Sequence, residues 1–259
     1  MHILLPPSET KRSGGGSIFS AVDLAHNDAL GETRQDIREA LVALSTDTEA
    51  AVKALKLGVK NRDELLHNLA LDSSGAMPAI DRYTGVLYDA LDAASLGESS
   101  RKWLAEHVSV QSALFGLVRA GDLIPAYRLS GSSRLPSLSH PLKRSWSSAH
   151  QGIDWESFEW ILDLRSKDYV ALAPLPAGAG AWLHVAQRSP DGEVRALNHF
   201  NKAAKGDLVR RLAESDAQIS GPQDLLSWAA SQSLEASFSE SDQTITLVTE
   251  LGAPTKTAG

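Results

Sequence analysis

Residues 1–11, MHILLPPSETK, decide how the rest of this sequence is interpreted. The run His2-Ile3-Leu4-Leu5 is short, apolar and ended by two prolines, a pattern that predicts a buried strand running into a loop. The loop that follows carries the polar side chains of residues 8–11 directly after the strand. Loops at strand ends are common places for functional sites, so this loop is a candidate, and a turn with two solvated charges is the alternative.

Outward from this strand, periodicity predicts helices and strands in no regular βαβ order. The expected helices cover residues 33–45, 46–57, 61–71, 99–107, 202–213 and 222–233. The expected strands cover residues 108–118 and 244–248, with a hairpin over 181–200 that turns at 190–192. We therefore predict one α+β domain over residues 1–251, followed by a disordered tail over 252–259.

Composition is that of a globular protein, with 42% hydrophobic and 22% charged residues among 259. The chain has no cysteine, which excludes disulfides, thiolate nucleophiles, cysteine-bound zinc and iron–sulfur clusters. We expect neither a signal peptide nor a membrane span, because no apolar run approaches 18 residues. These features suit a cytoplasmic protein.

Charge is distributed unevenly along the chain, although the net charge is −7. Residues 101–144 carry seven basic and two acidic side chains, and residues 201–211 carry four basic side chains and one acidic side chain. If the two stretches meet in space, they form a positive patch for an anion, a phosphate or a nucleic acid. If they lie on unrelated faces, the charges are simply solvated.

Several familiar catalytic motifs are absent. There is no HExxH and no histidine pair at metal-binding spacing, so we expect no metal and no other cofactor. The glycines at 14–16 lack the lysine and hydroxyl of a phosphate-binding loop, and no GxSxG elbow occurs.

Three polar clusters lie beside apolar runs, at residues 6–11, 119–128 and 202–210. In the second, a charged group among apolar neighbours needs a partner, and Asp122 with Arg128 is one possible pair. In the third, Lys202 and Lys205 share one helix face, where like charges disfavour each other unless an anion lies between them. We predict that the three clusters line one cleft.

Six segments in order resemble one known family. They are LLPPSETK (4–11), YTGVLY (83–88), SALFGLVR (112–119, followed by Asp122 and Ile124), YRL (127–129), LRSKDY (164–169) and NKAAKG (201–206). On these segments the chain resembles the YaaA family of peroxide stress resistance proteins. The resemblance implies a single compact domain of unusual topology, with a positively charged cleft and a helix-hairpin-helix element. It further implies a cytoplasmic protein that binds DNA by structure and limits oxidative damage when iron and peroxide coincide.

The resemblance also implies where DNA would bind. The helical hairpin falls on residues 46–71, with KLGVK (56–60) as its turn, and Lys60 stands where a second glycine is usual. Lys205 replaces the arginine of the family's last motif, which keeps the charge but loses bidentate phosphate geometry. The candidate DNA or anion contacts are Lys11, Lys53, Lys56, Gly58, Lys60, Arg62, Arg128, Lys202, Lys205 and Arg210. Such phosphate contacts give affinity without sequence specificity.

A second hypothesis is an enzyme of unassigned reaction that acts on a nucleobase, a nucleotide or another anionic small molecule. In it, Glu9 or Asp122 is the base, Lys202 or Arg128 holds the anion, and Tyr83 or Tyr127 stacks or donates a hydrogen bond. Ser8, Thr10, Arg165 and Ser166 complete this polar cleft. A third hypothesis is purely structural: Asp122 with Arg128 and Asp163 with Arg165 satisfy each other in a core. We expect a monomer in each case.

Overall fold

The N-terminal strand β1 (His2–Leu5) lies inside a sheet and is buried along its whole length. In the computed structural model, which describes residues 1–188, 194–196 and 201–249, β1 pairs in parallel with β3 (Val108–Ser112) and with β6 (Ile161–Asp163). Parallel strands that are covered on both faces read as continuous apolar runs, which explains the HILL sequence. The strand predicted over residues 2–5 is confirmed.

The main sheet has eight strands in the order β4-β3-β1-β6-β7-β10-β9, with β8 paired to β7. The further bounds are β4 Gly116–Arg119, β7 Gly180–Arg188, β8 Val194–Ala196, β9 Glu235–Ser239 and β10 Thr244–Val248. The five central strands β3, β1, β6, β7 and β10 pair in parallel in this spatial order. Strands β4, β8 and β9 each pair antiparallel with one neighbour. A separate two-stranded ladder joins β2 (Met77–Pro78) to β5 (Leu123–Ile124).

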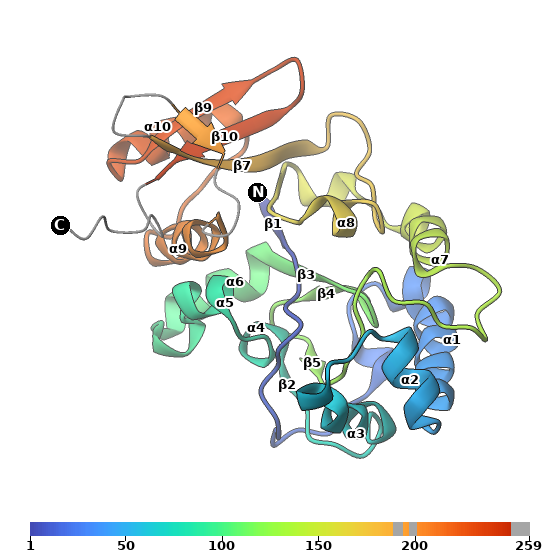
Figure 1. Cartoon of the computed structure of the whole chain (residues 1–259). Coiled ribbons are helices and arrows are strands. Elements are labelled where there is room, and N and C mark those ends of the chain that lie inside the picture. The colour runs from blue at the N-terminus through green and yellow to red at the C-terminus, as the bar shows by residue number, and fades with distance from the viewer. Residues whose placement is uncertain (189–193, 197–200, 250–259) are drawn as a thin grey trace, which may run out of the picture.

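Helices surround this sheet (Figure 1). The α-helices are α1 Asn27–Ser45, α2 Thr48–Ala54, α3 Leu65–Leu69, α4 Ala79–Arg82, α5 Val86–Leu91, α6 Glu98–His107, α7 Leu142–Ala149, α8 Lys167–Val170, α9 Asn201–Glu214 and α10 Pro222–Ser231. The 3₁₀ turns are η1 Ala21–Asp23, η2 Val59–Glu64, η3 Ala93–Ser95, η4 His150–Gly152 and η5 Glu156–Phe158. Helices α1, α2 and α3 gather at one end of the molecule, and α10 lies with β9 and β10 at the other (Figure 1).

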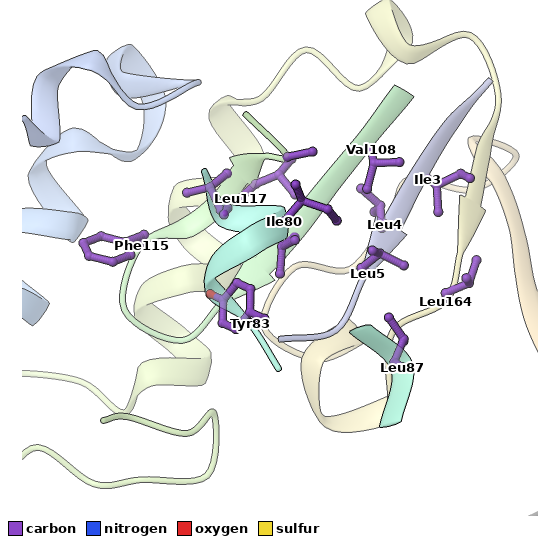
Figure 2. Close-up of a cluster of buried hydrophobic side chains, with 14 of the residues drawn as sticks. Ile3, Leu4, Leu5, Ile80, Tyr83, Leu87, Val108, Phe115, Leu117 and Leu164 are labelled. Carbon is purple, nitrogen blue, oxygen red and sulfur yellow. The ribbon is translucent and has the colours of Figure 1, made fainter. Parts of the chain in front are cut away.

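The hydrophobic core is continuous around β1. Figure 2 shows Leu4 and Leu5 packed among Val108 of β3, Leu87 of α5 and Leu164 just after β6, and all five side chains are buried. The next helix layer is close: a Cβ placed on Gly206 of α9 would lie 2.1 Å from the Leu87 carbonyl oxygen. The glycine of the NKAAKG segment is therefore required for α9 to reach α5.

The fold is a single compact mixed α/β structure, which the sequence anticipated only in part. The predicted strand over 108–118 is two antiparallel strands, β3 and β4, because Gly116 turns the chain with a φ of 66°. The parallel centre was not predicted, because the connections between its strands contain several short helices instead of one long crossover. The predicted hairpin turn at 190–192 and the tail at 252–259 lie outside the described residues.

The predicted helix-hairpin-helix over residues 46–71 is not confirmed. The segment contains α2 and α3 joined by η2, and α3 is only five residues long. Gly58 has an ordinary φ of −71°, while Lys56 adopts the left-handed conformation with a φ of 54°. The turn therefore does not use Gly58 as a left-handed glycine.

No helix within residues 1–188 and 201–249 combines the length and the apolar composition needed to cross a bilayer.

Candidate functional site

The carboxyl ends of β1, β3 and β6 lie side by side, because the three strands are parallel neighbours. The segments that leave them are 6–11, 113–115 and 164–166, and each begins within or beside a motif that the sequence singled out. Ligands of parallel sheets bind outside the carboxyl ends of the strands, where neighbouring connections run in opposite directions. We call the polar group gathered at the end of β1 the strand-end site. Its members are Glu9, Lys11, Glu64, Tyr83, Ser112, Tyr127 and Arg128.

Lys11 is the central group of the strand-end site. Its Nζ donates hydrogen bonds to the carbonyl oxygens of Ser8 at 2.9 Å and Glu9 at 3.2 Å. The same nitrogen lies 4.0 Å from the centre of the Tyr127 ring and 5.3 Å from that of Tyr83. The loop that follows β1 thus folds back and places an amine over two aromatic faces.

The surroundings of Lys11 disfavour its positive charge. Burial of the amine, and next the charge of Arg128, lower the pKa of Lys11 to about 7, although Glu64 and Glu9 oppose the shift. The side chain is nevertheless only half-buried, and Glu9 and Thr10 beside it are exposed. A lysine with a strongly lowered pKa at the carboxyl ends of parallel strands is a candidate functional residue.

A chain of three hydroxyl groups lies beneath this amine. Ser112 Oγ accepts the backbone N–H groups of Leu114 at 3.1 Å and Phe115 at 3.0 Å, so its own proton is donated to Tyr127 Oη at 2.8 Å. Tyr127 Oη and Tyr83 Oη share the next hydrogen bond, at 2.9 Å, in which either hydroxyl can donate. Burial raises the pKa of both tyrosines, so both hydroxyls stay protonated. One tyrosine proton fills this hydrogen bond, and the other has no acceptor among the hydrogen bonds of the described residues.

Arg128 forms the charged wall of the site. Its guanidinium contacts Glu9 Oε2 at 3.1 Å and Glu64 Oε2 at 3.1 Å, and only 8% of the residue is exposed. The buried amide of Asn68 fixes the backbone of Arg128 by accepting its N–H at 2.7 Å and donating to its carbonyl oxygen at 3.0 Å. Two carboxylates thus neutralise one guanidinium, which itself is held in place.

Hydroxyl contacts anchor the loop to the YTGVLY segment. Thr84 Oγ1 donates to Thr10 Oγ1 at 2.9 Å, and Tyr88 Oη donates to the Pro6 carbonyl oxygen at 2.8 Å. Gly85 has a φ of 96°, a conformation that side chains rarely adopt. The YTGVLY segment therefore serves to hold the strand-end loop in one conformation.

A second network lies at the end of β6. Arg165 is fully buried and contacts both oxygens of Asp163, at 2.8 and 2.6 Å, so the predicted pair of these two residues is confirmed. Lys205 Nζ donates to the Leu164 carbonyl oxygen at 2.8 Å, and Trp182 Nε1 donates to the Arg165 carbonyl oxygen at 2.9 Å. Burial lowers the pKa of Lys205 to about 8. These cations connect β6, β7 and α9 and are buried away from solvent.

Asp122 does not pair with Arg128, and that expectation was wrong. Its Oδ2 accepts the backbone N–H groups of Ala25 at 2.9 Å and Arg119 at 3.0 Å, which closes the turn after β4. Burial raises the pKa of Asp122, and the two backbone hydrogen bonds oppose that shift. Because backbone amides satisfy Asp122, Arg128 takes its carboxylates from Glu9 and Glu64 instead.

The structure therefore brings together only some of the predicted site residues. Ser8, Glu9, Thr10, Lys11, Tyr83, Tyr127 and Arg128 meet at the end of β1, whereas Arg165 and Lys205 belong to the network at the end of β6. Arg210 is engaged by Asp92, Glu214 and backbone oxygens, and Ser166 is an exposed residue at the start of α8. Lys53, Lys56, Gly58, Lys60, Arg62 and Lys202 are exposed.

The sequence did not single out two members of the strand-end site, Ser112 and Glu64, or Asn68, which holds the backbone of Arg128. Ser112 was a detectable signal, because it is a polar residue within the apolar run 108–118. Glu64 and Asn68 lie in the segment assigned to a DNA-binding hairpin, and nothing local indicated that they face Arg128.

Within the described part of the chain, no three histidine, aspartate or glutamate side chains lie close enough to hold a metal ion.

The arrangement defines a mixed α/β protein with a polar site at the carboxyl ends of parallel strands. Comparison with known proteins gives its family. The model of the family described as "Peroxide stress protein YaaA" matches residues 1–235, and the chain belongs to this family.

Relatives extend the similarity over nearly the full length. A UPF0246 protein of Corynebacterium glutamicum is 39% identical over 254 residues, which cover 96% of this chain and 100% of that protein. One from Corynebacterium efficiens is 38% identical over 256 residues, with coverages of 96% and 100%. One from Streptomyces coelicolor is 37% identical over 230 residues, with coverages of 87% and 88%.

Proposed function

We propose that this peroxide stress protein binds DNA through backbone phosphates and thereby limits damage by iron and peroxide. The observation that carries the proposal is the set of exposed lysines on the segment from α2 to η2. Lys53, Lys56 and Lys60 are all exposed, and none forms an ion pair within the described residues. Lysines without a carboxylate partner can neutralise the phosphates of a DNA backbone.

The local charge makes this a modest, salt-sensitive interaction. Arg62 lies 3.6 Å from Glu49, so part of its charge is already neutralised. Asp63 is exposed next to Arg62. The segment therefore depends on a few individual contacts, with Lys202 as a further exposed cation on α9. Affinity should fall steeply with salt, with a slope of roughly −0.9 for each phosphate contact.

The test is a titration of duplex and forked DNA across salt concentrations with single variants. Lys56→Gln and Lys60→Gln should each weaken binding and reduce the salt slope by about one contact. Lys102→Gln is a matched control, because Lys102 is an exposed lysine on α6 that pairs with Glu106 at 3.8 Å. Unchanged affinity and slope in the Lys53, Lys56, Lys60 and Lys202 variants would overturn the proposal.

A second candidate function is an enzyme that acts on a small molecule at the strand-end site. The specific observation is that an amine of lowered pKa and two tyrosine hydroxyls meet at the ends of parallel strands. Because Arg128 is neutralised by two glutamates, the geometry favours an uncharged substrate over the anion that the sequence suggested.

The two candidates differ in one measurable respect. Glu9→Gln removes a negative charge, so it should leave DNA affinity unchanged or slightly higher. Survival under peroxide that follows DNA affinity through the lysine variants and Glu9→Gln supports the DNA-binding function. Survival lost in Glu9→Gln, with the protein folded and its DNA affinity intact, supports the enzyme.

A further inference from the structure

We propose that Lys11 is a nucleophilic amine that forms an imine with the carbonyl carbon of an uncharged aldehyde or ketone, assisted by the hydroxyl of Tyr83. This inference deepens the second candidate function, on which it rests, and it requires no DNA binding. It assigns a reacting group to the strand-end site and a chemical class to its substrate.

The hydrogen bonds of Lys11 suit a neutral amine. An uncharged amine has two N–H groups and one lone pair, and the carbonyl oxygens of Ser8 and Glu9 accept two N–H groups at 2.9 and 3.2 Å. The lone pair is then left free for attack. Only the protonated form has a third N–H, and the Tyr127 ring at 4.0 Å is the neighbour that can receive it.

Lys11 lies at the boundary with solvent. The residue is half-buried, and the residues on either side of it, Thr10 and Arg12, are exposed. Among the described residues Lys205 is the other lysine with a lowered pKa, and it differs on this point, because it is 6% exposed and bonded to the Leu164 carbonyl oxygen. The strand-end site thus combines a weakly basic amine with a partly exposed position, and the network at β6 does not.

The hydroxyl chain supplies a proton donor. Ser112 donates to Tyr127, and Tyr127 shares a hydrogen bond with Tyr83 in which either hydroxyl can donate. When Tyr127 is the donor, the Tyr83 O–H is left without an acceptor among the hydrogen bonds of the described residues. Tyr83 is 2% exposed and its ring centre lies 5.3 Å from the Lys11 amine, so its hydroxyl proton is then a buried donor within the strand-end site. A buried donor without an acceptor is costly, and the oxygen of a bound carbonyl compound would satisfy it.

The chemistry balances with the groups present. The neutral nitrogen attacks the carbonyl carbon, the carbonyl oxygen takes a proton from Tyr83 Oη, and the nitrogen returns one of its two protons to the Tyr83 oxygen, which gives a neutral carbinolamine. Tyr83 then protonates the hydroxyl group, the carbon–oxygen bond breaks and water leaves as the carbon–nitrogen double bond forms. The remaining nitrogen proton returns to the Tyr83 oxygen. In total, amine and carbonyl give imine and water, with no oxidant or reductant.

Charge selects the substrate. The guanidinium of Arg128 lies between two carboxylates, Glu9 at 3.1 Å and Glu64 at 3.1 Å. A substrate carboxylate or phosphate would find Arg128 already neutralised and would meet two like charges. The site therefore fits a carbonyl compound without negative charge.

The experiment is reductive trapping on the full chain. The protein is incubated with glyceraldehyde, or with glyoxylate as the anionic probe, and imines are reduced with cyanoborohydride and located by peptide mass spectrometry. Labelling of each lysine is expressed relative to exposed Lys53 and Lys102 for the same probe. We expect glyceraldehyde to label Lys11 at least tenfold faster than these residues, and the labelling rate of Lys11 to have its pH midpoint near 7. The ratio of Lys11 labelling to that of the exposed lysines should be higher for glyceraldehyde than for glyoxylate.

Variants separate the parts of the inference. Lys11→Arg should abolish the fast labelling, and Tyr83→Phe should slow it at least tenfold without moving its pH midpoint. Lys205→Arg is the control for loss of any buried lysine and should leave Lys11 labelling unchanged. Labelling of Lys11 no faster than Lys53 in the wild-type protein would overturn the proposal without any variant. A higher ratio of Lys11 labelling to exposed-lysine labelling with glyoxylate than with glyceraldehyde would overturn the inference that the substrate is uncharged. DNA titrations of Lys11→Arg show separately whether the DNA-binding function stands.

Discussion

Two groups of cations in this protein differ in their surroundings. Lys11, Arg128, Arg165 and Lys205 lie in the family-like segments and are held by carboxylates or backbone carbonyl oxygens at the strand ends. The lysines from α2 to η2 lie outside those segments, and they are exposed and free of ion pairs in the described chain. These four motif cations hold the fold and the strand-end site, whereas the cations available to a large anionic partner are the exposed lysines from α2 to η2 and Lys202 of the NKAAKG segment.

Desolvation explains the difference. A charge removed from water has to be matched by partners with good geometry, and removal of one partner leaves the other buried and unpaired. An exposed lysine remains hydrated and gains little from its neighbours. Loss of a cation should therefore change stability strongly in the first group and little in the second, and four predictions test this comparison.

The largest effect on stability should come from Arg165→Ala. The change leaves Asp163 buried without its bidentate partner, so the free energy of unfolding should fall by about 3–5 kcal/mol. Urea denaturation measures it. In the double variant Arg165→Met with Asp163→Asn, much of the loss should return, since no unpaired charge is left. A loss below about 1 kcal/mol in Arg165→Ala would break the comparison, because it would place this pair with the surface ion pairs.

A smaller loss is expected at Asn68, which holds Arg128 through its backbone. Asn68→Ala should lower the free energy of unfolding by about 2–3 kcal/mol, because the N–H and carbonyl oxygen of Arg128 lose buried partners. Ser45→Ala removes only one of the contacts of Asn68 and is the matched control, with a smaller loss. Equal losses in the two variants would show that Asn68 does not act through Arg128.

Lys11 should make stability depend on pH in the alkaline range. Its pKa is about 7 in the folded protein and near 10.5 in the unfolded chain, so the unfolded chain binds more protons between these values. Stability should therefore rise with pH over this window, while below pH 7 the cost of the buried charge is present in full. Relative to Lys11→Met, the wild-type free energy of unfolding should rise on the order of 1–2 kcal/mol from pH 7 to pH 9. A constant difference between the two proteins would contradict the lowered pKa.

The smallest effects on stability should occur at the exposed lysines. Lys53→Gln, Lys56→Gln and Lys60→Gln should each change the free energy of unfolding by less than about 0.5 kcal/mol. The same variants are those expected to weaken DNA binding, so stability and affinity should separate. A loss above about 1 kcal/mol at any of them would show that the lysine belongs with the structural cations.

Local patterns predicted local features well. The strand at residues 2–5 follows from an apolar run and two prolines, and the Asp163–Arg165 pair follows from residues two positions apart. The pair of Asp122 with Arg128 was equally local and was wrong, because the Ala25 amide, 97 residues away, competes for the carboxylate.

Long-range features were not predictable from the same signals. Arg128 meets Glu9 across 119 residues and Lys11 meets Tyr127 across a similar separation, and both contacts depend on which strands become neighbours. That order is fixed by the burial of entire strands, which the periodicity of any one segment does not specify. The resemblance identified the segments involved, but not that Arg128 and Arg165 would be neutralised by carboxylates while Lys11 and Lys205 bond backbone carbonyl oxygens.

The central position of β1 has a consequence for how the chain is made. Leu4 is paired with Ser109 on one side and Asp163 on the other, so neither neighbour exists when β1 leaves the ribosome. At a synthesis rate of about 5–20 residues per second, the second partner emerges roughly 8–30 s later. During that interval the apolar strand β1 has no native neighbour on that side, and chaperones or transient contacts have to shield it. Non-local pairing of this kind also slows refolding.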